Sequence, residues 1–95
     1  MKLHYARLEL LRIEVDALVD LGAVDINWGH IAKRKHEVSD LDVYACLLDG
    51  HYAEHDTVPD RYISRLLRRD GTAVTVYFEV HEGPDGRRVW VETAF

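Results

Sequence analysis

A change in hydrophobic spacing at Gly50 constrains the fold of this chain more than any other feature. Before Gly50 the apolar residues recur three and four positions apart, as on one side of an amphipathic helix. After Gly50 they alternate with polar residues, as in strands that bury one face. Helices followed by hairpin-connected strands are typical of the α+β class. We therefore predict N-terminal helices packed on one face of a four- to five-stranded antiparallel sheet.

An amphipathic helix is predicted over residues 3–21. Its apolar stripe consists of Leu8, Leu11, Val15 and Leu18. Gly22 follows as a stop signal, because glycine readily ends a helix. The next apolar residues, Val24, Ile26 and Trp28, alternate with polar ones. This alternation predicts a short strand that is broken at Gly29.

A second helix is predicted to begin at Ser39, after a short helical turn over residues 30–36. Ser39 offers an N-cap, and Asp42 three residues later makes a weak variant of the capping box. Asp49-Gly50 would end this helix. Cys46 falls in its apolar part, and we expect a buried thiol there rather than a reactive nucleophile.

Four strands are predicted in the second half of the chain. They cover residues 51–58, 62–69, 72–81 and 87–95, with turn signals such as Asp70-Gly71 between them. In the clearest strand, residues 72–81, one face is formed by Val74, Val76, Phe78 and Val80.

The other face of the predicted sheet is the first candidate for function. If helices cover the valine face, the opposite face carries Tyr77, Arg88 and Trp90. Two aromatic residues and an arginine on an uncovered face are typical of a contact surface. The alternative is that the first helix folds back over this side and buries them.

The charge of the chain is distributed unevenly. The 95 residues carry a net charge of −5, which argues against a protein that binds nucleic acid over its whole surface. Residues 1–60 carry six basic and twelve acidic side chains, a sum of −6, whereas residues 61–95 carry six arginines and five carboxylates, a sum of +1. Any site for a polyanion would therefore be local, and the sheet half is the part that tolerates one.

No metal or other cofactor is expected. The string HYAEH at residues 51–55 matches a zinc-protease pattern, but that pattern requires a helix. Across a strand, His51 and His55 would lie about 13 Å apart and could not share an ion. The chain shows neither a signal peptide nor an apolar run long enough to span a bilayer, so we expect a cytoplasmic protein that does not contact membranes.

One basic cluster is flanked by histidines. Residues 33–35 are all basic, with His30 before them and His36 after them. A group that titrates near neutrality beside fixed positive charge is what RNA self-cleavage requires, because the 2′-hydroxyl must lose a proton and phosphorane charge must be held. The alternative is a solvated surface, which is the usual role of charge runs and of single histidines.

Two stretches of the chain resemble a family of small toxins. The string WGHIAKRKHEVS at residues 28–39, then Asp42-Val43 and Leu47-Leu48, is similar to the strand-to-helix motif of BrnT-type toxins and related RelE-like domains. The last two predicted strands resemble the end of those domains, which often finish in VVTA; this chain has VWVETA at residues 89–94. The resemblance divides the single domain, residues 1–95, into a core at 24–95 and an added helix at 1–22.

The resemblance implies a RelE/ParE-like fold whose open sheet face cuts RNA without a metal and is masked by an antitoxin. In that interpretation Lys33, Arg65 and Arg88 hold phosphate, and His36 or Tyr77 transfers protons. The partners would then be a cognate antitoxin and RNA.

A second interpretation keeps the fold without catalysis. The open face with Tyr77 and Trp90 would then bind another protein or a second copy of the chain. The family motif favours the endoribonuclease, and the acidic net charge favours the binding module.

Overall fold

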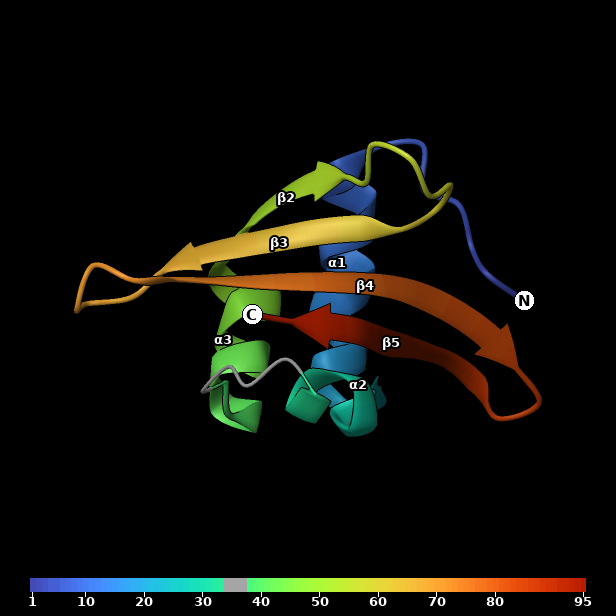
Figure 1. Ribbon diagram of the computed structural model, residues 1–95. Coiled ribbons are helices and arrows are strands. Elements are labelled where there is room, and N and C mark those ends of the chain that lie inside the picture. The colour runs from blue at the N-terminus through green and yellow to red at the C-terminus, as the bar shows by residue number, and fades with distance from the viewer. Residues whose placement is uncertain (34–37) are drawn as a thin grey trace.

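A computed structural model describes residues 1–33 and 38–95, with the backbone alone at residues 32 and 33. It has three helices and a five-stranded sheet (Figure 1). The elements in chain order are α1 (Leu8–Asp20), β1 (Val24–Ile26), α2 (Trp28–Lys33), α3 (Asp40–Asp49), β2 (His51–Glu54), β3 (Tyr62–Leu67), β4 (Ala73–Gly83) and β5 (Gly86–Ala94). The predicted α+β class is confirmed.

The sheet is mixed, so the prediction of an antiparallel sheet was wrong in part. The strand order is β1-β5-β4-β3-β2; β1 runs parallel to β5, and every other pair is antiparallel. β1 follows α1, which brings the chain to the outer edge of β5, where Val24 pairs with Val89 and Ile26 with Val91. The alternation in the sequence showed which residues of β1 share a face, but it holds no signal for strand direction.

Helix α1 is shorter than predicted at its N-terminal end. Residues 3–7 do not join it; Leu3 donates from its amide to the Val80 carbonyl at 2.8 Å, and Lys2 bridges to His81. Strand β3 pairs with β4 only as far as Phe78, which lies opposite Tyr62, the first residue of β3. Residues 1–3 pair with the part of β4 that follows Phe78.

The predicted stop of α1 at Gly22 is confirmed. Gly22 has φ +71° and donates to Val19, while the Ala23 amide donates to Leu18 at 2.8 Å. These two bonds form a Schellman motif, in which a left-handed glycine satisfies the last carbonyls of the helix.

Trp28 is the main local error of the sequence prediction. It begins α2 instead of ending a strand, and it is exposed. Asn27 changes the direction of the chain, because its amide still donates to the Val91 carbonyl while its own carbonyl accepts from His30 and Ile31. The strand therefore ends two residues earlier than the alternation indicated.

The capping box at the start of α3 is confirmed. The Asp42 amide donates to Ser39 Oγ at 3.2 Å, and the Ser39 amide donates to Asp42 Oδ2 at 3.0 Å. Cys46 is fully buried, as expected, and burial raises the pKa of its thiol. The helix ends where the Gly50 amide donates to the Cys46 carbonyl.

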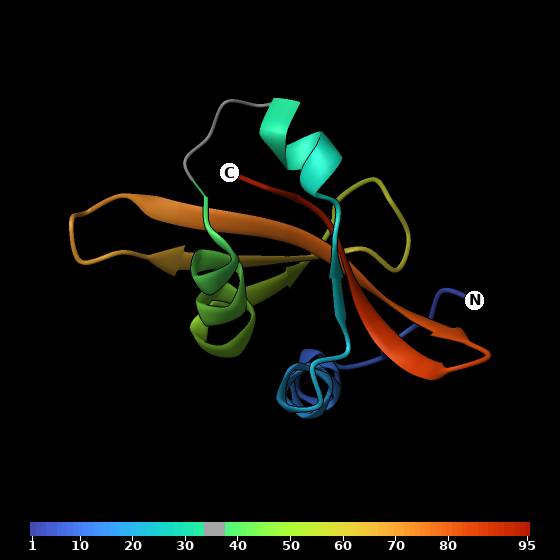
Figure 2. The same ribbon diagram turned by 90° about the horizontal axis from the view of Figure 1, so that it is seen from below.

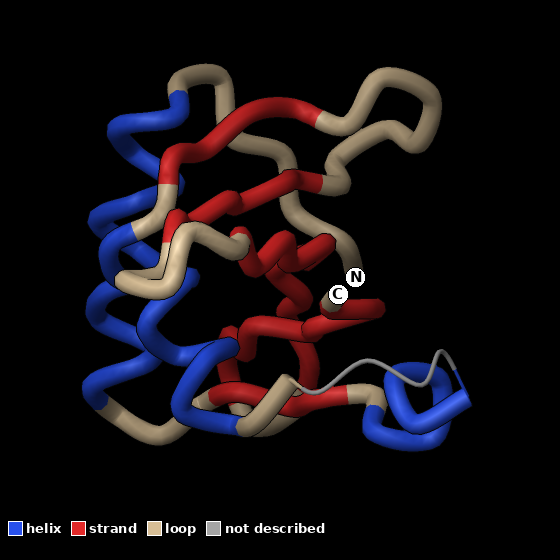
Figure 3. The backbone as a smooth tube through the Cα atoms, turned by 60° about the vertical axis from the view of Figure 1, so that its left-hand side comes forward, coloured by secondary structure: helices blue, strands red, loops and turns tan. Residues whose placement is uncertain are grey.

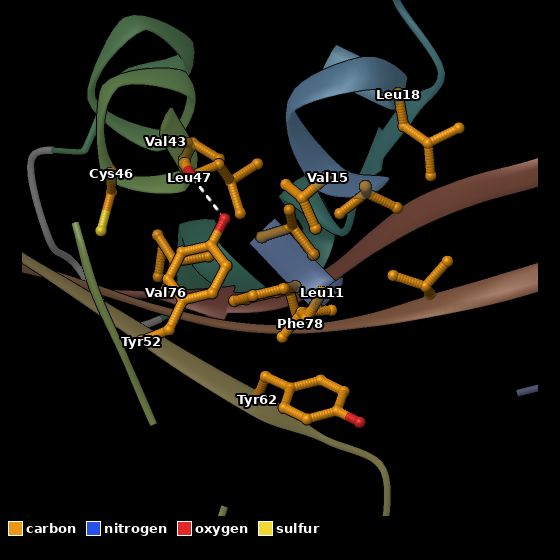
Figure 4. Close-up of a cluster of buried hydrophobic side chains, with 14 of the residues drawn as sticks. Leu11, Val15, Leu18, Val43, Cys46, Leu47, Tyr52, Tyr62, Val76 and Phe78 are labelled. Atoms are coloured by element: carbon orange, nitrogen blue, oxygen red, sulfur yellow. Dashed lines mark hydrogen bonds between the residues drawn. The ribbon is translucent and has the colours of Figure 1, made fainter. Parts of the chain in front are cut away.

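The helices α1 and α3 form one layer, and the sheet forms the other. They lie side by side in opposite directions on one face of the sheet, whereas α2 lies at the β1 edge toward the other side (Figures 2 and 3). The core between the layers contains Leu11 and Val15 from α1, Leu47 from α3 and Phe78 from β4 (Figure 4). The hydroxyl of Tyr52 reaches across this core to the Leu47 carbonyl.

Candidate functional site

We call the sheet surface opposite α1 and α3 the open face. Strand alternation and pairing assign to it His51, Ile63, Arg65, Thr75, Tyr77, Glu79, His81, Arg88, Trp90 and Asp25. The predicted division of β4 is confirmed, since Val74, Val76, Phe78 and Val80 are buried on the helical side. The alternative in which the first helix covers the open face is wrong, because α1 packs with α3 on the other side.

A line of aromatic rings crosses the middle of the open face. Tyr77 packs edge-to-face against His55 with ring centroids 5.2 Å apart, and against Phe95 with centroids 5.4 Å apart. Nδ1 of His55 accepts from the Val58 amide at 3.0 Å and from the Thr57 amide at 3.2 Å, so Nε2 carries the ring proton. These contacts hold the rings of the line in defined orientations.

A buried carboxylate organises the neighbouring part of the open face. Glu79 is 5% exposed and lies between three basic groups. Its oxygens are 2.8 Å from Arg61 Nε, 2.8 Å from His81 Nε2 and 3.1 Å from Lys2 Nζ. Burial alone would raise the pKa of Glu79, but the hydrogen bonds from His81, Arg61 and Lys2 outweigh it and hold the pKa below its usual value.

Arg88 and Trp90 are also engaged by carboxylates. Arg88 Nε donates to Asp25 Oδ2 at 2.8 Å and its Nη2 to Oδ1 at 3.2 Å, a paired contact that raises the pKa of the guanidinium. Trp90 Nε1 donates to Glu92 Oε2 at 2.7 Å. Glu92 is the extra residue where the β4–β5 register shifts beside Tyr77.

Arg65 differs from the other arginines of this surface. It is exposed, it lies between His51 of β2 and Thr75 of β4, and no carboxylate partner is found for it among the described residues. Its charge is therefore available to a ligand.

Three of the five predicted site residues, Arg65, Tyr77 and Arg88, lie on the open face, but they do not form one centre. The β4 partners of Arg65 and Arg88 are Thr75 and His81, six residues apart, which corresponds to about 20 Å along the strand. Tyr77 lies between these two arginines, two residues along β4 from Thr75. Lys33 belongs to α2, but its side chain lies outside the described part of the chain, as does the whole of His36.

Sequence reasoning missed three residues that shape this surface, namely His55, Arg61 and Glu79. His55 was considered only as part of the zinc-protease pattern. The structure places it just after β2, where its Nδ1 accepts hydrogen bonds. Within the described residues no three His, Cys, Asp or Glu side chains are grouped so that they could hold a metal ion. The alternation of β4 did assign Glu79 to the open face, but no signal indicated that the N-terminal segment would bury it.

These observations define the class of the protein as α+β, with a two-helix layer on a mixed five-stranded sheet whose other face is open. Within residues 1–33 and 38–95 no helix is both long enough and apolar enough to cross a bilayer. The chain matches no family model, no curated protein and no solved structure. The geometry of the open face is therefore the basis for a functional interpretation.

Proposed function

We propose that the chain is a protein-binding module that uses the open face as its recognition surface, on a RelE-like scaffold without catalysis. The observation that carries this proposal is that the basic groups there, apart from Arg65, pair with carboxylates. Lys2 and Arg61 are neutralised by Glu79, and Arg88 by Asp25. Phosphate would have to displace these carboxylates, whereas a protein partner can contact the aromatic residues between them.

The aromatic line suits such a partner. Tyrosine and tryptophan are enriched at the anchoring positions of interfaces, because they bury a large apolar area and keep a polar group for hydrogen bonding. Tyr77 and Trp90 are both half-buried on the open face, and their neighbours fix their orientation. A surface held in this way loses little conformational entropy on binding.

Photo-crosslinking tests this proposal directly. Tyr77 is replaced with p-benzoylphenylalanine, and the cells that express the variant are irradiated. We expect one protein adduct, which is lost when Trp90→Ala is added. The matched control carries the same group at Asp85, in the exposed β4–β5 turn. An adduct with RNA alone, or no adduct at position 77, would refute the binding module.

Endoribonuclease activity is the second candidate, and Arg65 is the observation that favours it. This exposed arginine lies beside Thr75 and near Tyr77, where it could hold phosphate next to a group that transfers a proton. The test is expression in bacteria while growth and RNA integrity are followed. Growth arrest with RNA cleavage that Arg65→Ala abolishes, and that Leu67→Ala retains, would support this activity; intact RNA and normal growth would exclude it.

A further inference from the structure

The outer surface of the helical layer is a second unpartnered region, on the opposite side of the molecule from the open face. We call it the helical face. Among the described residues, five of the eight exposed large hydrophobic side chains belong to it: Leu10, Ile13, Leu21, Leu41 and Leu48. Exposed apolar side chains gathered on one surface mark a site of interaction.

The apolar residues are spread across the outer surface of α1 and α3. With 3.6 residues per turn, Leu10 and Leu21 lie on the side of α1 away from Arg12, which contacts α3, and Ile13 lies between these two sides. The two helices run in opposite directions (Figure 1), and Arg12 of α1 donates to the Leu48 carbonyl at 2.8 Å, so the first half of α1 lies beside the end of α3. Leu21 ends α1 at the end of the layer where Leu41 begins α3. With 13 residues, α1 is about 20 Å long, which is room for three or more turns of another helix.

An open pocket of about 470 Å³ lies between the first half of α1 and the start of β2. Its apolar lining residues are Leu8, Ile13 and Tyr52, and its polar ones are Glu9, Asp16, Arg12 and His51. This volume lies within the range of pockets that enclose a whole ligand group, so it is large enough for one anchoring side chain.

The charge of the helical face decides what can occupy it. Four carboxylates are exposed here among the described residues: Glu9, Asp16, Asp20 and Asp49. Glu9 pairs with Arg7 at 3.5 Å, and the other three form no ion pair with any residue that the structure describes. Arg12 keeps its positive charge, since its partners, the Leu48 and Gly50 carbonyls and the Tyr52 ring, are neutral, but one guanidinium offsets only one of the carboxylates.

We propose that the helical face binds a basic amphipathic helix of a partner protein, which lies across α1 and α3. Leucine-like residues of that helix would cover the apolar side chains, and its lysines or arginines would pair with the carboxylates. A second copy of this chain would bring the same carboxylates to the interface, and like charges repel. Nucleic acid and anionic lipid are excluded by the same sign of charge.

Binding of model peptides tests this proposal independently of the open face. The probe is an 18-residue peptide in which leucines recur with helical spacing and lysines fill the remaining positions. One control peptide has glutamate in place of lysine, and another has the same leucines and lysines in scrambled order. We expect saturable binding of the helical basic peptide by titration calorimetry, at least tenfold weaker binding of the scrambled peptide and none of the acidic one.

Variants of the chain locate the site. Ile13→Ser with Leu48→Ser should weaken binding at least tenfold, whereas Leu67→Ser, at an exposed leucine of β3, should leave it unchanged. Asp16→Asn with Asp20→Asn should weaken binding and reduce its dependence on salt. Circular dichroism checks that each variant is folded.

Two results would overturn the proposal. The first is equal binding of the scrambled and helical basic peptides, because charge alone would then account for the affinity. The second is a dimer of the unmodified chain in sedimentation that Ile13→Ser converts to monomer, because the occupant would then be a second copy.

Discussion

The open face and the helical face differ in how many of their charged side chains form ion pairs. On the open face the carboxylates and basic groups pair with each other, as Glu79 does with Arg61 and Asp25 with Arg88. On the helical face Asp16 and Asp20 have no such partner among the described residues, and the apolar side chains beside them are flexible aliphatic ones. The charges of the open face are thus mostly paired, with Arg65 as the exception among the described residues, whereas on the helical face the carboxylates outnumber the basic groups.

This difference explains how a chain of net charge −5 can present two kinds of binding surface. Seven of the twelve carboxylates of residues 1–60 lie on α1 and α3. Glu14 and Asp42 pair with Arg87 and Arg68 of the sheet side, while Glu9, Asp16, Asp20 and Asp49 are exposed on the helical face. Side chains that pair within a surface add to folding stability, whereas unpaired ones are left to act on a ligand. Mutations on the two faces should therefore separate stability from binding.

The largest effect is expected at Gly50, which joins the two layers. A Cβ added there would lie 2.1 Å from Ser64 Oγ and 2.4 Å from the Cys46 carbonyl oxygen, so backbone must move. We expect Gly50→Ala to lower the free energy of unfolding by about 3 kcal/mol, at the upper end of overpacking costs. Urea denaturation measures this loss. Gly83→Ala, whose Cβ would meet no atom within 4 Å, serves as the control and should change stability by less than about 1 kcal/mol. Equal losses in the two variants would contradict the close approach at Gly50.

The next effect is expected at Glu79, the centre of pairing on the open face. Glu79→Gln leaves Lys2 and Arg61 without their carboxylate and should lower the free energy of unfolding by about 2 kcal/mol at pH 7. Glu9→Gln, on the exposed helical face, should cost less than about 0.5 kcal/mol.

Low pH should lower the free energy of unfolding in the same way as Glu79→Gln, because it protonates the carboxylate. Its folded-state pKa lies below the usual value of 4.5, so the stabilisation is complete above pH 4.5 and is lost as the pH falls through the lower, folded-state pKa. Denaturation curves measured between pH 7 and pH 2 should therefore converge for the unmodified chain and Glu79→Gln. Parallel curves over this range would show that the carboxylate contributes nothing specific.

A smaller effect is expected at Tyr77, in the aromatic line. Tyr77→Leu removes the edge-to-face contacts with His55 and Phe95 and should cost about 1 kcal/mol. Tyr77→Phe keeps the ring and should leave stability unchanged in the same denaturation assay. The phenylalanine variant also sharpens the functional comparison, because it should retain partner binding but would abolish a proton transfer that depends on the hydroxyl.

Patterns of neighbouring residues in the sequence predicted those features of the structure that depend on a short segment of the chain. The alternation from Val74 to Val80, the capping box of Ser39 and the stop at Gly22 were all read correctly, because each depends on residues close in sequence. The parallel pairing of β1 and the burial of Glu79 were missed, since both require segments far apart in the chain. Glu79 meets Lys2 only because the N-terminal segment pairs with the far end of β4.

The smallest effect on stability is expected on the helical face, where binding should change instead. Leu41 is 75% exposed, so Leu41→Ser should change the free energy of unfolding by less than about 0.5 kcal/mol. On the same helix Leu47 is fully buried, and Leu47→Ala should cost about 2–5 kcal/mol because it opens a cavity in the core. Titration of Leu41→Ser with the helical basic peptide should nevertheless show weaker binding than titration of the unmodified chain. If Leu41→Ser lowered stability as much as Leu47→Ala, the exposed leucines would serve the fold and not a partner, and the contrast between the two faces would disappear.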